Sequence, residues 1–322
     1  MTFFDKLWKK TTYSFFLCLC LILTGCGSRH EAYVSTSTTI RDNSPVCLLP
    51  VADGITVFGN DYVSVDASHM AEGYIMVSYS GENTKVKMQL TGPDYITYTY
   101  NLTGNGYETF PLSAGDGTYQ LGVYENVEGS QYATVFSQEL SVSITNSMGP
   151  FLYPNQYVHF DSSSDVVKEA QILVAGAHDD LEAITAIYNY VISNITYDYD
   201  KAQNVQSGYI PDVDEILSIK TGICLDYAAV MSSMLRSQRI PTRLEVGYAG
   251  DAYHAWISTY VENQGWVNGI IQFDGHSWSI MDPTFAANSS EKSLKNFIGD
   301  GDNYVTKYIY SILNSIFRRI FG

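Results

Sequence analysis

Two kinds of hydrophobic periodicity divide this chain. Between about residues 46 and 144, short runs alternate apolar and polar positions and are separated by turns rich in glycine, proline and asparagine. Alternation of this kind is typical of strands that bury one face, and turns at this spacing predict an antiparallel β-sandwich. The predicted strands are 74–79, 86–90, 95–102, 118–124 and 132–144.

From about residue 165 the apolar positions follow the period of a helix. They recur at three- and four-residue spacing in 165–175 and again in 179–195, which predicts two amphipathic helices. The second opens with Asp179-Asp180-Leu181-Glu182, a start suited to capping. The proline- and glycine-containing stretch 146–155 is the predicted domain boundary. The expected fold class is therefore α+β, with an all-β domain followed by a mixed one.

A lone cysteine lies where the next helical pattern begins. Residues 211–217 predict a short helix, and Gly222 is expected to end it because glycine accepts positive φ without a Cβ penalty. An apolar stripe then predicts a second helix, whose first turn contains Cys224; its members are Ala228, Met231, Met234 and Leu235. Unpaired N–H groups and the positive end of the helix dipole favour a thiolate at that position.

Two later segments supply candidate partners for this thiol. The strand-like run 253–257 contains His254, and the short run 277–284 reaches Asp282 just before a proline. A nucleophilic cysteine needs a base that takes its proton and a third group that orients the base. A cysteine at a helix start, followed by histidine and aspartate on successive strands, has the chain order that such a site needs.

The same residues resemble a known family. The motifs are Lys220-Thr221-Gly222-Ile223-Cys224-Leu225-Asp226-Tyr227-Ala228, Ile240-Pro241-Thr242-Arg243, His254-Ala255-Trp256 and Asp274-Gly275-His276-Ser277-Trp278, closing on Asp282-Pro283-Thr284. Over roughly residues 165–290 they resemble the core of transglutaminase-like, papain-like proteins. The resemblance implies an α+β domain with Cys224 as nucleophile, His254 as base and Asp282 as orienting acid. The stretch 260–273 is longer than in the simplest members, and its turn residues predict an extra hairpin.

The implied chemistry leaves the acceptor open. The thiolate would attack an amide carbonyl of a protein or peptide and form a thioester, while His254 protonates the leaving amine. An amine acceptor would then make the protein a transglutaminase, and water would make it a peptidase or amidase. The alternative is a catalytically silent binding or structural envelope protein that keeps the fold. The site requires no cofactor, and the remaining histidines lack the paired spacing of a zinc site.

The N-terminus is predicted to be a targeting signal peptide and not part of the folded protein. Three lysines precede an apolar run of about a dozen residues, too short to span a bilayer as a helix. The run ends in Leu23-Thr24-Gly25-Cys26, which resembles a bacterial lipobox. The resemblance implies cleavage of residues 1–25, diacylation of Cys26 and anchoring at the extracytoplasmic face of the cell membrane. Residues 26–45 are then a tether rich in serine and threonine.

The net charge bears on which partners the protein can bind. The formal net charge is −16, and no basic patch is present, which argues against a nucleic-acid partner.

The stretch 116–121 resembles the tyrosine corner of immunoglobulin-like domains, so 46–145 is expected to be an immunoglobulin-like sandwich that acts as a spacer or binds a ligand. Cys47 is expected to be an inert buried residue. The transglutaminase-like domain is predicted to cover 150–300.

The tail carries a wide apolar stripe from Val305 to Ile320 with basic residues beside it. This pattern predicts an amphipathic helix over 303–322. Such a helix could either pack on the preceding domain or lie on the membrane surface.

Overall fold

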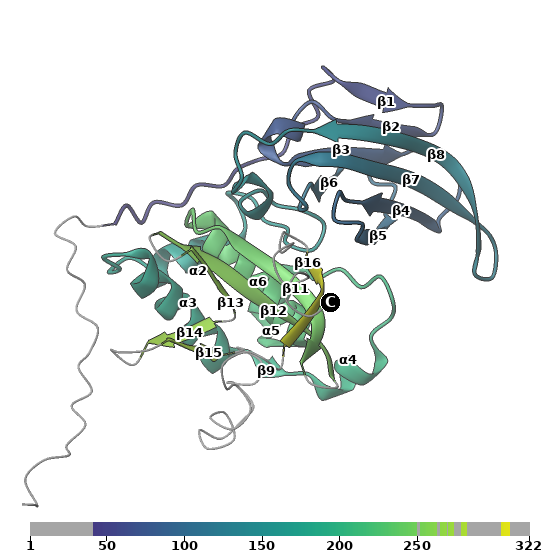
Figure 1. Ribbon diagram of the computed structural model, residues 1–322. Helices are drawn as coiled ribbons and strands as arrows, with labels where there is room; N and C mark the ends of the chain where they lie inside the picture. Colours follow the sequence, from purple (N-terminus) through teal and green to yellow (C-terminus); the bar gives the residue numbers. More distant parts are fainter. Residues whose placement is uncertain are drawn as a thin grey trace, which may run out of the picture. The chain divides into compact units, whose positions relative to one another are not determined.

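The N-terminal region folds as two antiparallel sheets of four strands each. The computed structural model (Figure 1) describes residues 41–249, 252–262, 265–268, 270–273, 278–281 and 304–309. The first sheet has the order β1-β2-β3-β6 and the second the order β5-β4-β7-β8. The strands are β1 (Val57–Gly59), β2 (Val63–Asp66), β3 (Tyr74–Tyr79), β4 (Val86–Thr91), β5 (Thr97–Leu102), β6 (Glu108–Pro111), β7 (Gly117–Glu128) and β8 (Gln131–Val142), with a 3-10 turn η1 (Met70–Glu72).

One apolar core is shared by the two sheets. In β4 every second residue is buried, namely Val86, Met88 and Leu90, as expected for a strand with one face on the core. Buried residues of both sheets, including Val65 and Phe110 from the first, belong to the same cluster. The predicted sandwich is thus confirmed at the level of two packed antiparallel sheets, while its immunoglobulin-like class stays a prediction.

Tyr119, the residue at the centre of the predicted tyrosine corner, is buried in this core. Its hydroxyl donates a hydrogen bond to the carbonyl of Gly115, four residues earlier, at 3.0 Å. A bond of this kind back to the upstream backbone is what a tyrosine corner requires.

The boundaries of several strands differ from their predicted positions. The turn expected at 126–129 lies later, because β7 continues to Glu128 and the chain reverses at Gly129, where φ is +56°. Figure 1 shows the resulting β7–β8 hairpin as a long curved ribbon. The alternation did not reveal β1, β2 and β6, since strands of three or four residues contain only one or two periods of the pattern.

The second region contains a helix that is buried all round. Its helices are α2 (Asp165–Leu173), α3 (Asp180–Asn194), α4 (Tyr199–Asn204), α5 (Val213–Ile219) and α6 (Cys224–Ser237), preceded by a 3-10 turn η2 (Gly149–Phe151). Asp179 caps α3 as predicted, accepting the Glu182 N–H at 2.9 Å. Every residue of α6 from Asp226 to Ser237 is buried, and the helices α2, α3 and α5 all pack against it.

A four-stranded sheet lies beside α6 (Figure 1). Its strands are β11 (Thr242–Ala249), β12 (Ala252–Val261), β13 (Gly265–Asn268) and β16 (Tyr304–Ile309), in the order β13-β12-β11-β16. Of these, β11 and β12 pack against α6. The β12–β13 pair is the extra hairpin predicted within 260–273. Two further pairs are β9 (Thr196–Tyr197) with β10 (Thr221–Gly222), and β14 (Ile270–Phe273) with β15 (Trp278–Met281).

The predicted C-terminal helix is wrong at its start. Residues 304–309 are the strand β16, which pairs antiparallel with β11 from Glu245↔Ile309 to Ala249↔Tyr304. The physical reason is that β11 would otherwise present an unpaired edge of N–H and C=O groups, and the β-branched and aromatic residues of this stretch suit a strand. The rest of the predicted helix, 310–322, lies outside the described residues.

The predicted tether also needs correction at its C-terminal end. Residues 41–47, which we call the N-terminal strap, run along the α-helical region rather than free of it. Arg41 Nε lies 2.7 Å from Asp180 Oδ1, and the Val46 N–H donates to the Ser237 carbonyl at 2.8 Å. Cys47 packs against the core that contains α6. Polar composition alone predicted a tether here, but these residues find hydrogen-bond partners far along the chain.

Candidate active site

The structure confirms that Cys224 is the first residue of a helix. The preceding helix α5 ends at Ile219, and Lys220 follows in the left-handed conformation with φ of 56°. The prediction that Gly222 supplies this turn is therefore wrong. Gly222 is needed for a different reason, because a Cβ there would lie 2.7 Å from the Cβ of Asp226 and 2.9 Å from its Oδ2. The backbone before the cysteine thus passes directly against the Asp226 side chain.

Asp226 organises the start of α6. The helix cap is Ile223, whose side chain has no acceptor, and Asp226 Oδ2 instead accepts the Ile223 N–H at 2.8 Å. The same oxygen accepts from Lys201 Nζ at 2.6 Å, while Oδ1 accepts from the Tyr209 hydroxyl at 2.8 Å. Asp226 is 0% exposed, so this carboxylate is buried and held on both oxygens.

Sequence reasoning missed this cluster of Lys201, Tyr209 and Asp226. Asp226 was noticed only as part of the family motif. An acidic residue at the third helical position is a signal of reciprocal capping, but the usual serine or threonine at the cap is replaced by Ile223. Nothing local to Lys201 or Tyr209 points to the cysteine helix.

His254 lies near the start of β12, as predicted, and is buried. It pairs across the ladder with Gly247 of β11. Its ring stacks on that of Trp256, with centroids 6.4 Å apart. Because side chains alternate along a strand, His254 shares a face with Trp256 and Ser258, whereas Ala255 and Ile257 point the other way, into the core cluster.

The face that carries His254 contains a second buried carboxylate. Glu245 accepts hydrogen bonds from the Trp256 indole at 3.0 Å, from the Ser258 hydroxyl at 2.7 Å and from the Thr306 hydroxyl at 3.2 Å. Burial raises the pKa of Glu245, although these donors act in the opposite direction. These hydrogen bonds connect β11, β12 and β16 on the face of the sheet that carries His254.

Chain topology brings Cys224 and His254 to the same end of this unit. The strand β11 follows α6 after a short connection and contacts it, so it returns along the helix. The 14 residues of α6 span about 20 Å, and β11 covers a similar length between Thr242 and Gly247. Gly247, and with it the paired His254, therefore lies at the level of the helix start.

Two of the predicted site residues lie outside the described residues. One is Asp282, which directly follows the strand β15 that ends at Met281. The other is Cys26, with the whole of the predicted signal and lipobox. Within the described part of the chain, no helix combines the length and the hydrophobicity needed to cross a membrane.

Residues 168–269 match a protein family described as the transglutaminase-like superfamily. The matched range contains Cys224, at the start of α6, and His254, on β12. The chain contains a transglutaminase-like domain. This confirms the family resemblance and the α+β class predicted from the sequence.

Two relatives share parts of this sequence. UPF0252 protein MJ1282 of Methanocaldococcus jannaschii is 32% identical over 97 residues, which are 26% of this chain and 28% of the relative. Protein YebA of Bacillus subtilis is 24% identical over 233 residues, 64% of this chain and 29% of the relative. The chain therefore spans under a third of the length of either relative.

Solved structures of the same kind resemble the chain only distantly. The periplasmic domain of TgpA from Pseudomonas aeruginosa covers 76% of this chain and 98% of its own, with 12% identity and a TM-score of 0.33. The match to red sea bream transglutaminase covers 66% of this chain and 48% of the transglutaminase, with 14% identity and a TM-score of 0.30. Likenesses this remote carry no argument about activity.

The other cysteine of the described chain, Cys47, is placed differently from Cys224. Both thiols are free and partly buried. Burial, and to a lesser degree the nearby Asp161 carboxylate, raise the pKa of Cys47. A thiol with a raised pKa is mostly protonated at neutral pH and is a poor nucleophile, in line with the inert role expected for it.

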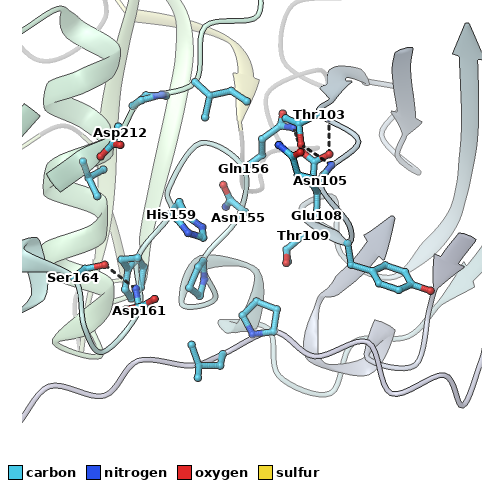
Figure 2. A pocket seen from close by; sticks show the side chains of 18 of the residues that line it. Thr103, Asn105, Glu108, Thr109, Asn155, Gln156, His159, Asp161, Ser164 and Asp212 are labelled. Atoms are coloured by element: carbon cyan, nitrogen blue, oxygen red, sulfur yellow. Dashed lines mark hydrogen bonds between the residues drawn. The ribbon is translucent and has the colours of Figure 1, made fainter. Parts of the chain in front are cut away.

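A cavity of about 660 Å³ lies apart from these residues (Figure 2). Its lining comes from the stretch 103–109, the segment 154–164 and the approach to α5 at 210–214, and it includes neither Cys224 nor His254. His159 also lines this cavity. In the described ranges no group of three or more His, Cys, Asp or Glu side chains is arranged to hold a metal ion.

Proposed function

We propose that the transglutaminase-like domain is a thiol acyltransferase or amidase that uses Cys224, His254 and Asp282 on protein or peptide amides. The observation that carries the proposal is Cys224 as the first residue of a buried helix inside the family-matched range. A thiolate there is favoured by the N–H groups and dipole of the helix start. His254, at the start of β12, is the proposed base, and Asp282, one residue beyond β15, is the proposed orienting group.

The proposed reaction has two halves. In the first, Cys224 Sγ forms a bond to the amide carbonyl carbon, and the carbonyl electron pair moves to oxygen. N–H groups at the start of α6, among them that of Cys224, are the proposed donors to that oxyanion. The C–N bond then breaks, His254 gives its proton to the amine, and a thioester remains. Water or a second amine attacks the thioester and restores the thiol.

We further propose that the protein is held at the extracytoplasmic face of a bacterial membrane through a diacylated Cys26. The Leu23-Thr24-Gly25-Cys26 motif supports this. The N-terminal strap is consistent with it, because it leaves only the residues before Arg41 as a tether.

The deciding experiment uses purified protein, candidate peptides rich in glutamine, and a labelled primary amine. Amine incorporation would identify transfer, new peptide termini would identify proteolysis, and ammonia release alone would identify deamidation. Cys224→Ala and His254→Gln should each reduce the signal by about a thousandfold or more. Cys47→Ala is the matched control and should keep full activity.

A parallel measurement tests the thiol without any substrate. Iodoacetamide at neutral pH should label Cys224 faster than Cys47, as followed by mass spectrometry of the two peptides. Labelling of Cys224 no faster than Cys47, together with the absence of all three activities, would favour the alternative of a silent binding or structural protein.

A further inference from the structure

A buried carboxylate lies two residues after the proposed nucleophile. Asp226 receives an N–H from Ile223, just before Cys224, so the backbone on both sides of the cysteine is tied to one side chain. Its remaining partners come from the chain around α4. Lys201 lies within α4, and Tyr209 lies in the segment between α4 and α5.

Asp226 places a carboxylate in the same first turn of α6 as the Cys224 thiol. A negative group close to a cysteine disfavours the thiolate, while a positive one favours it. Lys201 Nζ lies 2.6 Å from Asp226 Oδ2, and it also donates to the Tyr209 hydroxyl at 2.7 Å. The ammonium group therefore opposes the negative charge at the helix start, and Tyr209 shares the bonding.

Tyr209 is suited to remain a donor in this cluster. Burial, followed by the hydrogen bond to Asp226 and the charge of that carboxylate, raises the pKa of Tyr209. Its hydroxyl therefore stays protonated over the whole working range of pH. The ammonium of Lys201 also lies over the Tyr209 ring, 4.2 Å from its centroid, which fixes the two side chains against each other.

We propose that Lys201 and Tyr209 are positioning residues for Cys224, acting through Asp226. They hold the carboxylate in place, so that the turn from Gly222 to Cys224 keeps one geometry, and Lys201 offsets a charge that would otherwise suppress the thiolate. The catalytic meaning of this role rests on the proposed function, but the effect on the thiol itself does not.

Other titratable groups near the cluster, or on the elements that pack against α6, remain constant between variants. They are Asp212 and Glu215 near Tyr209, Glu245 and His254 on β11 and β12, and Glu169 and Tyr188 on α2 and α3. Because none of them is altered, a difference between the variants below reports on the cluster alone.

The test is the rate of Cys224 alkylation by iodoacetamide between pH 5 and pH 10, measured in the full chain by peptide mass spectrometry. Lys201→Met should move the pH profile upward and slow labelling near neutral pH by about tenfold. Lys201→Arg keeps the positive charge and should restore the profile to within about twofold. Lys168→Met, which removes an exposed lysine of α2, is the matched control and should leave it unchanged.

Cys47 serves as an internal control for folding in each sample. If Lys201→Met labelled Cys224 with the profile of the parent protein while Cys47 also stayed protected, the proposal would be overturned. If the Lys201→Met protein is unfolded, which rapid labelling of Cys47 would show, the Tyr209→Phe variant tests the proposal instead. Loss of its hydroxyl should change Cys224 labelling, and Tyr199→Phe, an exposed neighbour, should not.

Failure of the two proposals can be told apart. A protein that shows no activity on any amide but still shifts its labelling profile in Lys201→Met would keep the positioning role and lose the enzymatic one. An active protein whose labelling ignores Lys201 would do the reverse.

Discussion

At the scale of single residues, Gly222 and Asp226 lie two positions before and two positions after Cys224, and they contact each other in space. The glycine backbone lies against the carboxylate side chain so closely that a methyl group would overlap it. The identity of residue 222 therefore controls where Ile223 and Cys224 begin the helix. This requirement is one of space and not of backbone dihedral angle.

Gly222→Ala is expected to lower the free energy of unfolding by about 1–3 kcal/mol, because it forces Asp226 or the turn to move. It should also change the rate of Cys224 alkylation. Gly176→Ala is the control, since a Cβ there meets nothing within 4 Å. Denaturant titration of both variants checks the prediction, and equal stabilities would contradict it.

At the scale of elements, the buried Glu245 network joins three strands of the sheet that packs on α6. It accepts bonds from β12 and from β16, which are neighbours of β11 on opposite sides. The strand β16 is therefore held by a side-chain bond as well as by its ladder with β11. This long-range pairing explains why residues 304–309 form a strand and not the predicted helix.

Glu245 makes stability depend on pH in a defined direction. Because burial raises its folded pKa above the unfolded value of about 4.3, its contribution is fully present below that value. It is lost as pH rises through the folded pKa, at about 1.4 kcal/mol per unit of difference. Wild type should lose stability relative to Glu245→Gln between pH 5 and pH 8.

Urea titrations at several pH values measure this difference. Glu82→Gln, at an exposed turn, is the matched control and should track wild type at every pH. A gap between wild type and Glu245→Gln that stays constant from pH 5 to pH 8 would contradict the prediction.

At the scale of the whole molecule, the transglutaminase-like domain draws on residues that precede the sandwich in sequence. The N-terminal strap is bonded to α3 and to the end of α6, although the entire sandwich lies between them in the chain. Arg41 joins three segments, because it also donates to Asn43 and to the carbonyl of Gln238. A domain cut at residue 150 would lose these contacts.

Arg41→Ala is expected to destabilise the protein by about 1–3 kcal/mol, since a buried guanidinium with several acceptors is lost. The control is Lys168→Ala, which removes an ion pair of similar length to Asp165. That lysine side chain is 60% exposed, against 9% for Arg41, so its loss should change stability by about 0.5 kcal/mol or less. Thermal melts of the two variants would contradict the prediction if they coincide.

Much of the fold follows from local pattern. Alternation along 74–79 and 86–90, and helical spacing along 165–175 and 179–195, predicted elements that the structure contains with shifts of a few residues. Cys224 at a helix start and His254 on a strand were predictable for the same reason. A periodic apolar pattern records which face of an element is buried, and it needs only neighbouring residues.

The sequence by itself thus determined the two regions, the longer strands and helices within them, and the candidates Cys224 and His254. Only the tertiary structure decided which residues meet across long separations. Lys201 and Tyr209 reach Asp226 over 25 and 17 residues, Arg41 reaches Asp180 over 139, and 304–309 becomes a strand by pairing with β11. The physical reason is that periodicity encodes burial of a face, whereas the partner that covers it depends on how the whole chain packs.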